Sequence, residues 1–224
     1  MNTMTNASSN TPSGTPSNAS VISSGEPAPI RVRPTTLEGG VVRLEPLDER
    51  HASDLLEETA RDTFRYFRGP PPVWTLDGWK RFIREAIATP ARVPFAVVER
   101  SSGRCVGSSS YCDIREADRG VEIGYTWYAE RCRGTMVNPE SKLLLLAHAF
   151  ETLGCVRVQL KCDARNTRSA AAIAKLGAKH EGIIRSHLYM HDGHLRDTSQ
   201  FSIIAAEWPA VKAGLEARLR ASSR

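Results

Sequence analysis

The residues whose types and spacing suggest chemistry begin at a loop between two predicted elements. A strand pattern at 121–128 leads into Arg131-x-x-Gly134, and a helical pattern follows from Asn138. Backbone N–H groups at such a junction have no partner inside the helix, and the helix dipole makes them attractive to anions. Gly134 lets the backbone approach a ligand closely because it carries no Cβ. The loop is therefore predicted to hold a pyrophosphate, with an ordinary strand-to-helix turn as the alternative.

A second group of polar residues lies at the start of a later helical pattern. Asn166 and Ser169 are three residues apart, so they share a helix face with the apolar residues Ile173 and Leu176. An amide and a hydroxyl that face a sheet need hydrogen-bond partners. A ligand in a gap of the sheet would supply them. Alternatively, Asn166 caps the helix and Ser169 bonds a backbone carbonyl.

These residues must be positioned by alternating strand and helix patterns. The predicted strands are 41–44, 94–99, 105–114, 121–128, 156–160, 183–190 and 198–204. The predicted helices are 51–60, one capped by Thr75 with Trp79, Phe82, Ile83 and Ile87 on its apolar face, 138–150, 166–176 and one after Pro209. This order predicts an α/β (α+β) fold, with a mixed, mostly antiparallel sheet and helices on both faces.

The order and spacing of these motifs resemble one family. The motifs are Glu122 to Tyr125, Arg131-x-x-Gly134, Asn166-x-x-Ser169, Leu176 to Ala178 with Glu181 and Gly182, and Asp197 to Trp208. Over residues 33–220 the sequence resembles the GCN5-related N-acetyltransferase (GNAT) fold, and most of all its RimJ/RimL-type branch. The resemblance implies that the 121–128 strand and the strand from Val156 are parallel and splay apart to admit a ligand.

The resemblance implies acetyl-CoA as the donor. Its pantetheine arm would pair like an extra strand with the backbone near Trp127 and Tyr128. Asn166 would bond the arm, and Ser169 would protonate the departing thiolate. The loop residues whose N–H groups would hold the pyrophosphate are Arg131, Cys132, Arg133, Gly134, Thr135 and Met136. Met136 stands where the family usually has a small residue, and Asn138-Pro139 predicts a late start of the following helix.

The implied reaction is acetyl transfer to an amine, which must lose a proton to attack. Glu122 is the first candidate for the base, directly or through water; a strand carboxylate that bonds a neighbour is the alternative. Some relatives carry a carboxylate in the strand after Gly182, where this sequence has apolar Leu188. Its neighbours His187 and Tyr189 are therefore further acid–base candidates. A backbone N–H of the 124–128 segment would stabilise the oxyanion.

Other residues are weaker candidates. Arg133, Lys142, Arg165 and Arg168 are candidate ligands of the 3′-phosphate of CoA, or solvated charges. Tyr66, Phe67 and Trp74 are candidates for an acceptor pocket, or core residues. His187, His191 and His194 have no acidic or cysteine partner at metal-ligand spacing, so no metal site is predicted.

Composition limits the remaining possibilities. The 224 residues carry a net charge of +5, which suits a small anionic ligand. Residues 1–29, rich in Ser, Thr, Asn and Pro, are predicted to be a disordered tail before a single acetyltransferase domain, 30–224. Five cysteines without a Cys-x-x-Cys pair, no long apolar run and no signal-peptide pattern predict a cytoplasmic protein without a membrane segment.

The leading hypothesis is an acetyl-CoA-dependent N-acetyltransferase whose acceptor, a small amine or a protein N-terminus, stays open. Direct attack of the amine is favoured over an acetyl-cysteine intermediate, because no cysteine has an obvious activating histidine. The alternative is a non-catalytic module that senses acyl-CoA. Nucleic-acid binding is not expected, because Lys and Arg are scattered rather than striped. Monomer and homodimer both stay open as alternatives, because the sequence marks no interface.

Overall fold

The computed structural model describes residues 28–222, so the predicted tail, 1–29, falls almost entirely outside the described residues. Over the described range one sheet contains eight strands: β1 Leu37–Glu38, β2 Val42–Pro46, β3 Val93–Glu99, β4 Cys105–Arg115, β5 Gly120–Tyr128, β6 Arg157–Asp163, β7 Lys179–Tyr189 and β8 Leu195–Ile204. The α-helices of this range are α1 Ala52–Glu58, α2 Leu76–Ala88, α3 Val137–Ala147, α4 Thr167–Ala174 and α5 Trp208–Ser222. Shorter helical turns are Glu49–His51, Arg61–Phe64, Glu130–Cys132 and His148–Thr152.

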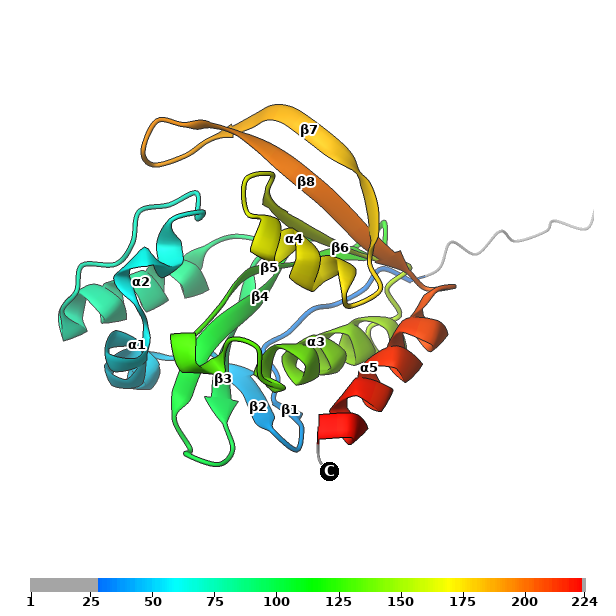
Figure 1. Ribbon diagram of the computed structural model, residues 1–224, viewed down its shortest axis with the longest axis horizontal. Helices are drawn as coiled ribbons and strands as arrows, with labels where there is room; N and C mark the ends of the chain where they lie inside the picture. The colour runs from blue at the N-terminus through cyan, green and yellow to red at the C-terminus, as the bar shows by residue number, and fades with distance from the viewer. Residues whose placement is uncertain (1–27, 223–224) are drawn as a thin grey trace, which may run out of the picture.

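The sheet is mixed, as predicted. Its strand order is β1-β2-β3-β4-β5-β6-β8-β7, and β5 and β6 are its one parallel pair within the described residues. A helical crossover through α3 separates these two strands in the chain, which is the connection that parallel strands require. The β7–β8 hairpin arches over α4 at the top of the molecule (Figure 1).

Helices cover both faces of the sheet, and the alternation of β3 shows how the sequence specifies this. Phe95 and Val97 pack into a core with α3, α4 and α5, whereas Ala96 and Val98 pack into a second core with α1 and α2. Successive side chains of a strand point to opposite faces, so a strand covered on both sides must be apolar throughout. Figure 1 shows α1 and α2 on one side of the sheet and α3 and α5 side by side on the other.

Helix α2 follows its predicted pattern with one difference. Thr75 caps it by accepting a hydrogen bond from Gly78 N at 3.1 Å, and Trp79 and Ile83 are fully buried. Ile87, predicted on the apolar face, is instead 48% exposed, and Ala86 takes the buried position. With 3.6 residues per turn, positions 86 and 87 both lie near the apolar face of α2, and the smaller side chain, that of Ala86, is the one buried against the sheet.

Helix α3 differs from its prediction at both ends. It begins at Val137 rather than Asn138, and its N-cap, Met136, makes no capping hydrogen bond with its side chain. It then widens into a π-turn over His148–Thr152 before Gly154, whose φ of +70° ends it as predicted. The Asn138-Pro139 pair lies within the first turn, where the missing proline N–H costs no helical hydrogen bond.

Candidate active site

The parallel strands β5 and β6 pair only at their beginning. Gly120, Val121 and Glu122 lie opposite Arg157, Val158 and Gln159, and the pairing then stops although both strands continue. Beyond Glu122, the edge of β5 that faces β6 has no partner strand. A cavity of about 790 Å³ is lined by both strands where they diverge, and by the first turn of α4. The predicted gap in the sheet therefore exists.

A β-bulge shapes the β5 side of this gap. In the pairing with β4, Ser110 lies opposite Gly124 and Ser108 opposite Trp127, so β5 contains one extra residue. Tyr125 adopts φ of +49° there, a left-handed conformation that is costly for a large side chain. Its ring lies 3.8 Å from the guanidinium carbon of Arg92. A bulge turns peptide groups away from the ladder, so it leaves backbone donors available to a ligand.

Glu122 lies at the point where the two strands part. Its carboxylate pairs with Lys161 of β6, with Oε2 2.8 Å from Nζ, and it lines the cavity. A Cβ on Gly124 would lie 2.8 Å from Glu122 Oε1 and 2.8 Å from Cys112 Sγ. Glycine at 124 is therefore required for the observed position of this carboxylate. Both interpretations of Glu122, as the base and as a strand carboxylate that bonds a neighbour, are compatible with this geometry. The carboxylate bonds Lys161, and Glu122 also lines the cavity.

The first turn of α4 forms the opposite wall. Asn166 caps the helix by accepting a hydrogen bond from Ser169 N at 3.1 Å, and both residues line the cavity. Ser169 also bonds the thiol of Cys162; burial raises the pKa of Cys162, and this hydrogen bond opposes the increase. The capping interpretation of Asn166 is thus observed, and Asn166 and Ser169 both also line the cavity.

The loop between β5 and α3 uses some of its N–H groups internally. Cys132 N and Arg133 N bond backbone carbonyls at 3.0 Å, and Thr135 N bonds Cys132 O at 3.4 Å. The Arg131 side chain points away from the cavity to Glu58 of α1 and Glu99 of β3, at 2.9 Å from each. Arg131 therefore fixes the loop through its side chain.

Three other N–H groups of this segment are available. Within the described residues, those of Gly134, Met136 and Asn138 have no acceptor in the protein. Gly134, with φ of +80°, and Asn138 line the cavity. A second cavity of about 270 Å³ adjoins it and shares Gly134 and Asn138, and its cationic lining residues are Arg168, Lys175 and Arg218. This combination of unpaired N–H groups, a helix N-terminus and cations is suited to phosphate groups.

The two acid–base candidates of β7 are placed differently. His187 lines the cavity, and its Nδ1 lies 3.1 Å from Thr198 Oγ1. Tyr189 is 72% exposed and does not line the cavity, although alternation places it on the same strand face as His187. The register of β7 against β8 shifts between Ile184 and Leu188, with Ser186 at φ of +49°, and β7 is an edge strand. The structure therefore brings His187, but not Tyr189, to the other candidates.

With this geometry described, the comparison with known sequences decides the family. Residues 42–179 match the description "Acetyltransferase (GNAT) domain". The chain belongs to the GNAT acetyltransferase family. The predicted family and fold class are confirmed, and the cavity between β5 and β6 is the candidate active site of a GNAT domain.

Relatives and solved structures agree with this assignment. "Putative ribosomal N-acetyltransferase YdaF" of Bacillus subtilis strain 168 is 30% identical over 110 residues, which are 49% of this chain and 59% of that protein. The chain thus matches less than two thirds of the length of this curated relative. A GCN5-related N-acetyltransferase from Brucella melitensis is 28% identical, with a TM-score of 0.80 over 85% of this chain and 88% of that chain. RimJ of Mycobacterium smegmatis, solved with CoA-disulfide, shares the fold at 24% identity, with a TM-score of 0.70 over 84% and 96% of the two chains.

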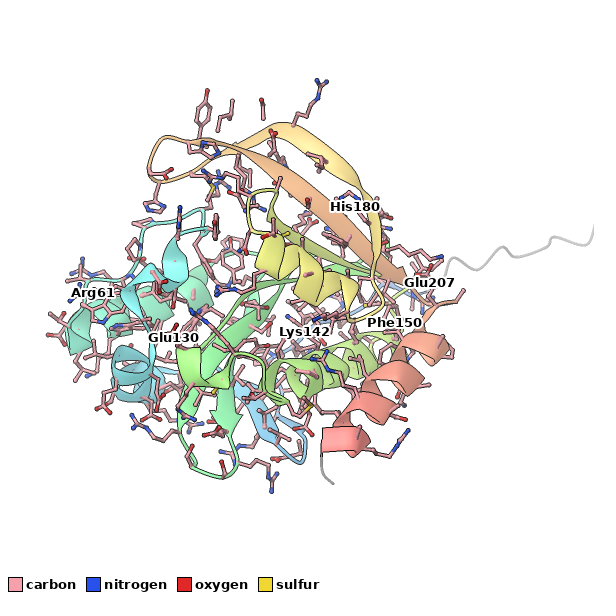
Figure 2. The ribbon with its side chains drawn as sticks, viewed as in Figure 1. Arg61, Glu130, Lys142, Phe150, His180 and Glu207 are labelled. Carbon is pink, nitrogen blue, oxygen red and sulfur yellow. The ribbon has the colours of Figure 1, made fainter. Side chains whose placement is uncertain are left out.

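One buried cation of this GNAT domain has an unexpected position. Lys142 of α3, predicted as a candidate phosphate ligand, is only 4% exposed and lies near the centre of the molecule (Figure 2). Its Nζ lies 2.6 Å from Thr126 Oγ1 and 3.3 Å from Ser109 Oγ. Burial lowers the pKa of Lys142 to about 7. The sequence held no signal for this placement, because a lysine two turns into a helix is ordinarily exposed.

The far side of the cavity is closed by two segments distant in sequence. Tyr66 and Phe67 line the cavity, as predicted for an acceptor pocket, whereas Trp74 does not and packs edge-on against Phe64 and Trp79. The tip of the β7–β8 hairpin docks on this aromatic loop, since His191 N donates to Arg68 O at 3.0 Å. A ligand on this side is therefore enclosed between the aromatic loop and the hairpin.

Two further features of the described residues concern ions and membranes. No group of three or more His, Cys, Asp or Glu side chains is arranged to hold a metal ion in this part of the chain. No helix within residues 28–222 is long and apolar enough to cross a membrane. All five cysteines are buried free thiols.

Proposed function

We propose that the protein is an acetyl-CoA-dependent N-acetyltransferase that acetylates a primary amine by direct attack. The observation that carries this proposal is the splay of β5 from β6 beyond Glu122, which leaves one strand edge unpaired along a cavity of about 790 Å³. An extended amide-containing arm is the natural occupant of such an edge, because it can take the place of the missing strand.

The residues around the cavity fit CoA as a substrate. The unpaired N–H groups of Gly134, Met136 and Asn138 would hold the pyrophosphate, and the free edge near Trp127 and Tyr128 would pair with the pantetheine arm. The cations of the smaller cavity, Arg168, Lys175 and Arg218, are suited to the 3′-phosphate. RimJ, which shares this fold, was solved with a CoA-disulfide.

Each bond and proton of the proposed transfer step can be assigned to a named group. The neutral amine nitrogen attacks the thioester carbonyl, the new C–N bond forms, and the C–S bond breaks. Glu122 takes the proton that the amine loses, directly or through water, and Ser169 gives a proton to the departing thiolate and regains one from solvent water. A backbone N–H of the bulged 124–128 segment stabilises the oxyanion. His187 is the second candidate for the base, since burial lowers its pKa and keeps its imidazole neutral at pH 7.

A direct assay separates this function from the non-catalytic alternative. Purified protein is incubated with acetyl-CoA and a panel of primary amines and peptides, and release of CoA thiol is measured. Amine-dependent thiol release supports the proposal. Tight CoA binding by calorimetry without release for any amine supports the acyl-CoA-sensing module instead.

Two further predictions concern the location of the protein in the cell and its oligomeric state. Five free cysteines agree with a cytoplasmic location. The exposed apolar residues Ile183, Ile184 and Tyr189 on edge strand β7 favour a homodimer through that edge. Light scattering of the purified protein measures its mass in solution, and a monomer at all concentrations would contradict the dimer.

A further inference from the structure

The acceptor side of the cavity contains arginines that make no direct ion pair. Among the other cations of the lining, Lys161 pairs with Glu122 and Arg165 with Asp163, both at 2.8 Å, whereas Arg65, Lys142 and Arg168 make no ion pair with a described residue. Arg68 and Arg196 line the same cavity, and neither makes an ion pair with a described residue. Nε of Arg196 is buried and has no hydrogen-bond partner. A buried guanidinium nitrogen without an acceptor is unusual, because its desolvation is normally offset by a hydrogen bond.

These arginines gather around the candidate base. Burial lowers the pKa of Arg196, and Asp163 and Glu122 are among the acids that oppose this effect. Burial also lowers the pKa of His187, and the cations of Lys161, Arg196 and Arg68 lower it further. These groups come from the aromatic loop, β6, β7 and β8. They surround the acceptor end of the cavity, whose lining also contains the carboxylates of Glu122, Asp62, Asp113 and Asp163.

This cationic group is distinct from the cations at the proposed phosphate end. Arg68 and Arg196 line only the larger cavity, whereas Arg168 lines both and Lys175 and Arg218 line only the smaller one. The phosphates of CoA would lie near Gly134 and Asn138, which the two cavities share. Arg68 is instead in the loop on which the β7–β8 hairpin docks. The donor phosphates therefore leave the two acceptor-side arginines without an anion.

We propose that the acceptor is an anionic amine, a primary amine that carries a carboxylate or phosphate a few bonds away, with Arg196 and Arg68 binding that anion while the amine faces Glu122. This inference rests on the proposed acetyltransferase function and names its substrate class. A simple alkylammonium ion or a lysine-rich chain end would be repelled by this group of cations. An amino acid or amino phosphate brings the compensating charge, and a guanidinium binds either anion through two parallel hydrogen bonds.

The test compares matched amines that differ only in the anion. Thiol release is measured for phenylalanine against phenethylamine, for phosphoethanolamine against ethanolamine, and for peptide amides that begin with Asp against Asn. We expect kcat/KM to favour the anionic member by about tenfold or more, the ratio that one charge-assisted hydrogen bond provides. The first two pairs tell carboxylate from phosphate, and the third tells a free amino acid from an acidic chain end. Equal kcat/KM within all three pairs would overturn the proposal.

Variants tie the preference to the arginines. In Arg196→Met the ratio of kcat/KM for the anionic amine to kcat/KM for the neutral amine should fall about tenfold; this ratio is the readout, because both amines meet the same change around His187. Arg68→Met, a change at an exposed side chain, should reduce the advantage without affecting folding. Arg220→Met on the exposed face of α5 is the matched control and should change nothing. An advantage that survives in both cavity variants would contradict the assignment.

A binding measurement keeps this inference separable from the proposed function. Calorimetry with CoA-saturated protein compares N-acetylphenylalanine with N-acetylphenethylamine, which needs no turnover. We expect the carboxylate to bind about tenfold more tightly, and Arg196→Met to remove the difference. If no amine releases thiol but this preference is present, the proposed catalysis fails and anion recognition stands. If thiol is released but the preference is absent in both assays, the acetyltransferase stands and the anionic acceptor is wrong.

Discussion

Glu122 has the position and the surroundings that a base for amine attack requires. It lies where β5 and β6 part, half-buried beside Lys161, and Gly124 leaves room for its carboxylate. The Lys161 ammonium holds one carboxylate oxygen, Oε2, at 2.8 Å. This ion pair orients the carboxylate at the cavity wall, so Lys161 is a positioning residue for Glu122.

Replacing this carboxylate tests its role at the residue scale. Glu122→Gln removes the proton acceptor and keeps the shape, so kcat should fall by about 10²- to 10⁴-fold while CoA affinity is unchanged. Steady-state thiol release and calorimetry measure the two quantities. Glu216→Gln on α5 is the control. Wild-type kcat in Glu122→Gln would assign proton removal to water or to His187.

Lys142 makes a prediction about stability. Its pKa in the folded protein is about 7, because burial disfavours the ammonium form, whereas an unfolded lysine has a pKa of about 10.4. Between these values the unfolded chain binds the additional proton, so the free energy of unfolding should increase as the pH rises from 7 toward 10. In Lys142→Met this part of the pH dependence should disappear, whereas the exposed Lys175→Met should retain it. Denaturant unfolding at pH 7 and pH 9.5 measures both; an identical increase in all three proteins would contradict the buried-ammonium explanation.

The sequence predicted the role of a side chain where that side chain bonds residues close to it in the chain. Asn166 was expected either to cap a helix or to face a ligand, and its carbonyl oxygen does the first while the residue lines the cavity. It failed for Lys142, because the burial of this side chain depends on hydroxyls of two strands, Ser109 and Thr126, which no local pattern connects to α3. The exposure of Tyr189 likewise depends on a register shift in β7.

At the scale of elements, the β5–α3 loop is fixed from outside the cavity. Arg131 links it to α1 and β3 through Glu58 and Glu99, and thereby holds the N–H groups of Gly134 and Met136 in place. The predicted role, in which the backbone N–H of Arg131 helps to hold the pyrophosphate, stays a prediction. The Arg131 side chain contributes to the site by keeping the loop ordered. The Arg131 backbone precedes the available N–H groups of Gly134 and Met136 in the chain.

Arg131→Met should therefore weaken CoA binding without altering chemistry. We expect the Kd for CoA to rise by about three- to tenfold, since partly exposed ion pairs are each worth no more than about 1 kcal/mol. The kcat at saturating acetyl-CoA should match the wild type. Calorimetry and steady-state kinetics distinguish the two effects. A fall in kcat with unchanged Kd would mean that Arg131 acts in the transfer step.

Helix α3 is tied to the first strands by one carboxylate. Glu140 lies in its first turn and accepts hydrogen bonds from Gly40 N at 2.9 Å, Val41 N at 2.6 Å and Val42 N at 2.7 Å. Glu140→Gln should lower the free energy of unfolding by about 2 kcal/mol, because an amide accepts these bonds less strongly than a carboxylate. Denaturant unfolding measures the change, with the exposed Glu130→Gln as control. Equal stability of the two variants would show that water replaces the lost bonds.

The order of the elements could be predicted because periodicity and capping residues are local. The prediction missed the two-residue strand β1 and the π-turn at His148–Thr152, since neither changes the hydrophobic period. The bulge in β5 was also not predictable. A tyrosine at φ of +49° gives no sequence signal of the kind that glycine gives, and only the pairing of β4 with β5 reveals it.

At the scale of the whole molecule, the cavity exists because two cores support diverging strands. The larger core packs β5 and β6 against α3, and the smaller packs Trp127 at the end of β5 among the aromatic residues of α2 and its preceding loop. Each strand is thereby held on its own side of the gap, which keeps the unpaired edge of β5 open. The docked β7–β8 hairpin encloses the acceptor side, whereas the phosphate end lies between the β5–α3 loop and α4.

We propose that acetyl-CoA occupies the edge of β5 left open by β6, and amide hydrogen exchange measures this occupancy at the backbone itself. Exchange is compared with and without saturating acetyl-CoA, with α2 as the internal reference. We expect slower exchange that is confined to residues 123–128 and 134–138. These amides would gain hydrogen-bond acceptors on the pantetheine arm and on the phosphates of acetyl-CoA. Unchanged exchange in both segments, at a concentration where acetyl-CoA is bound, would contradict it.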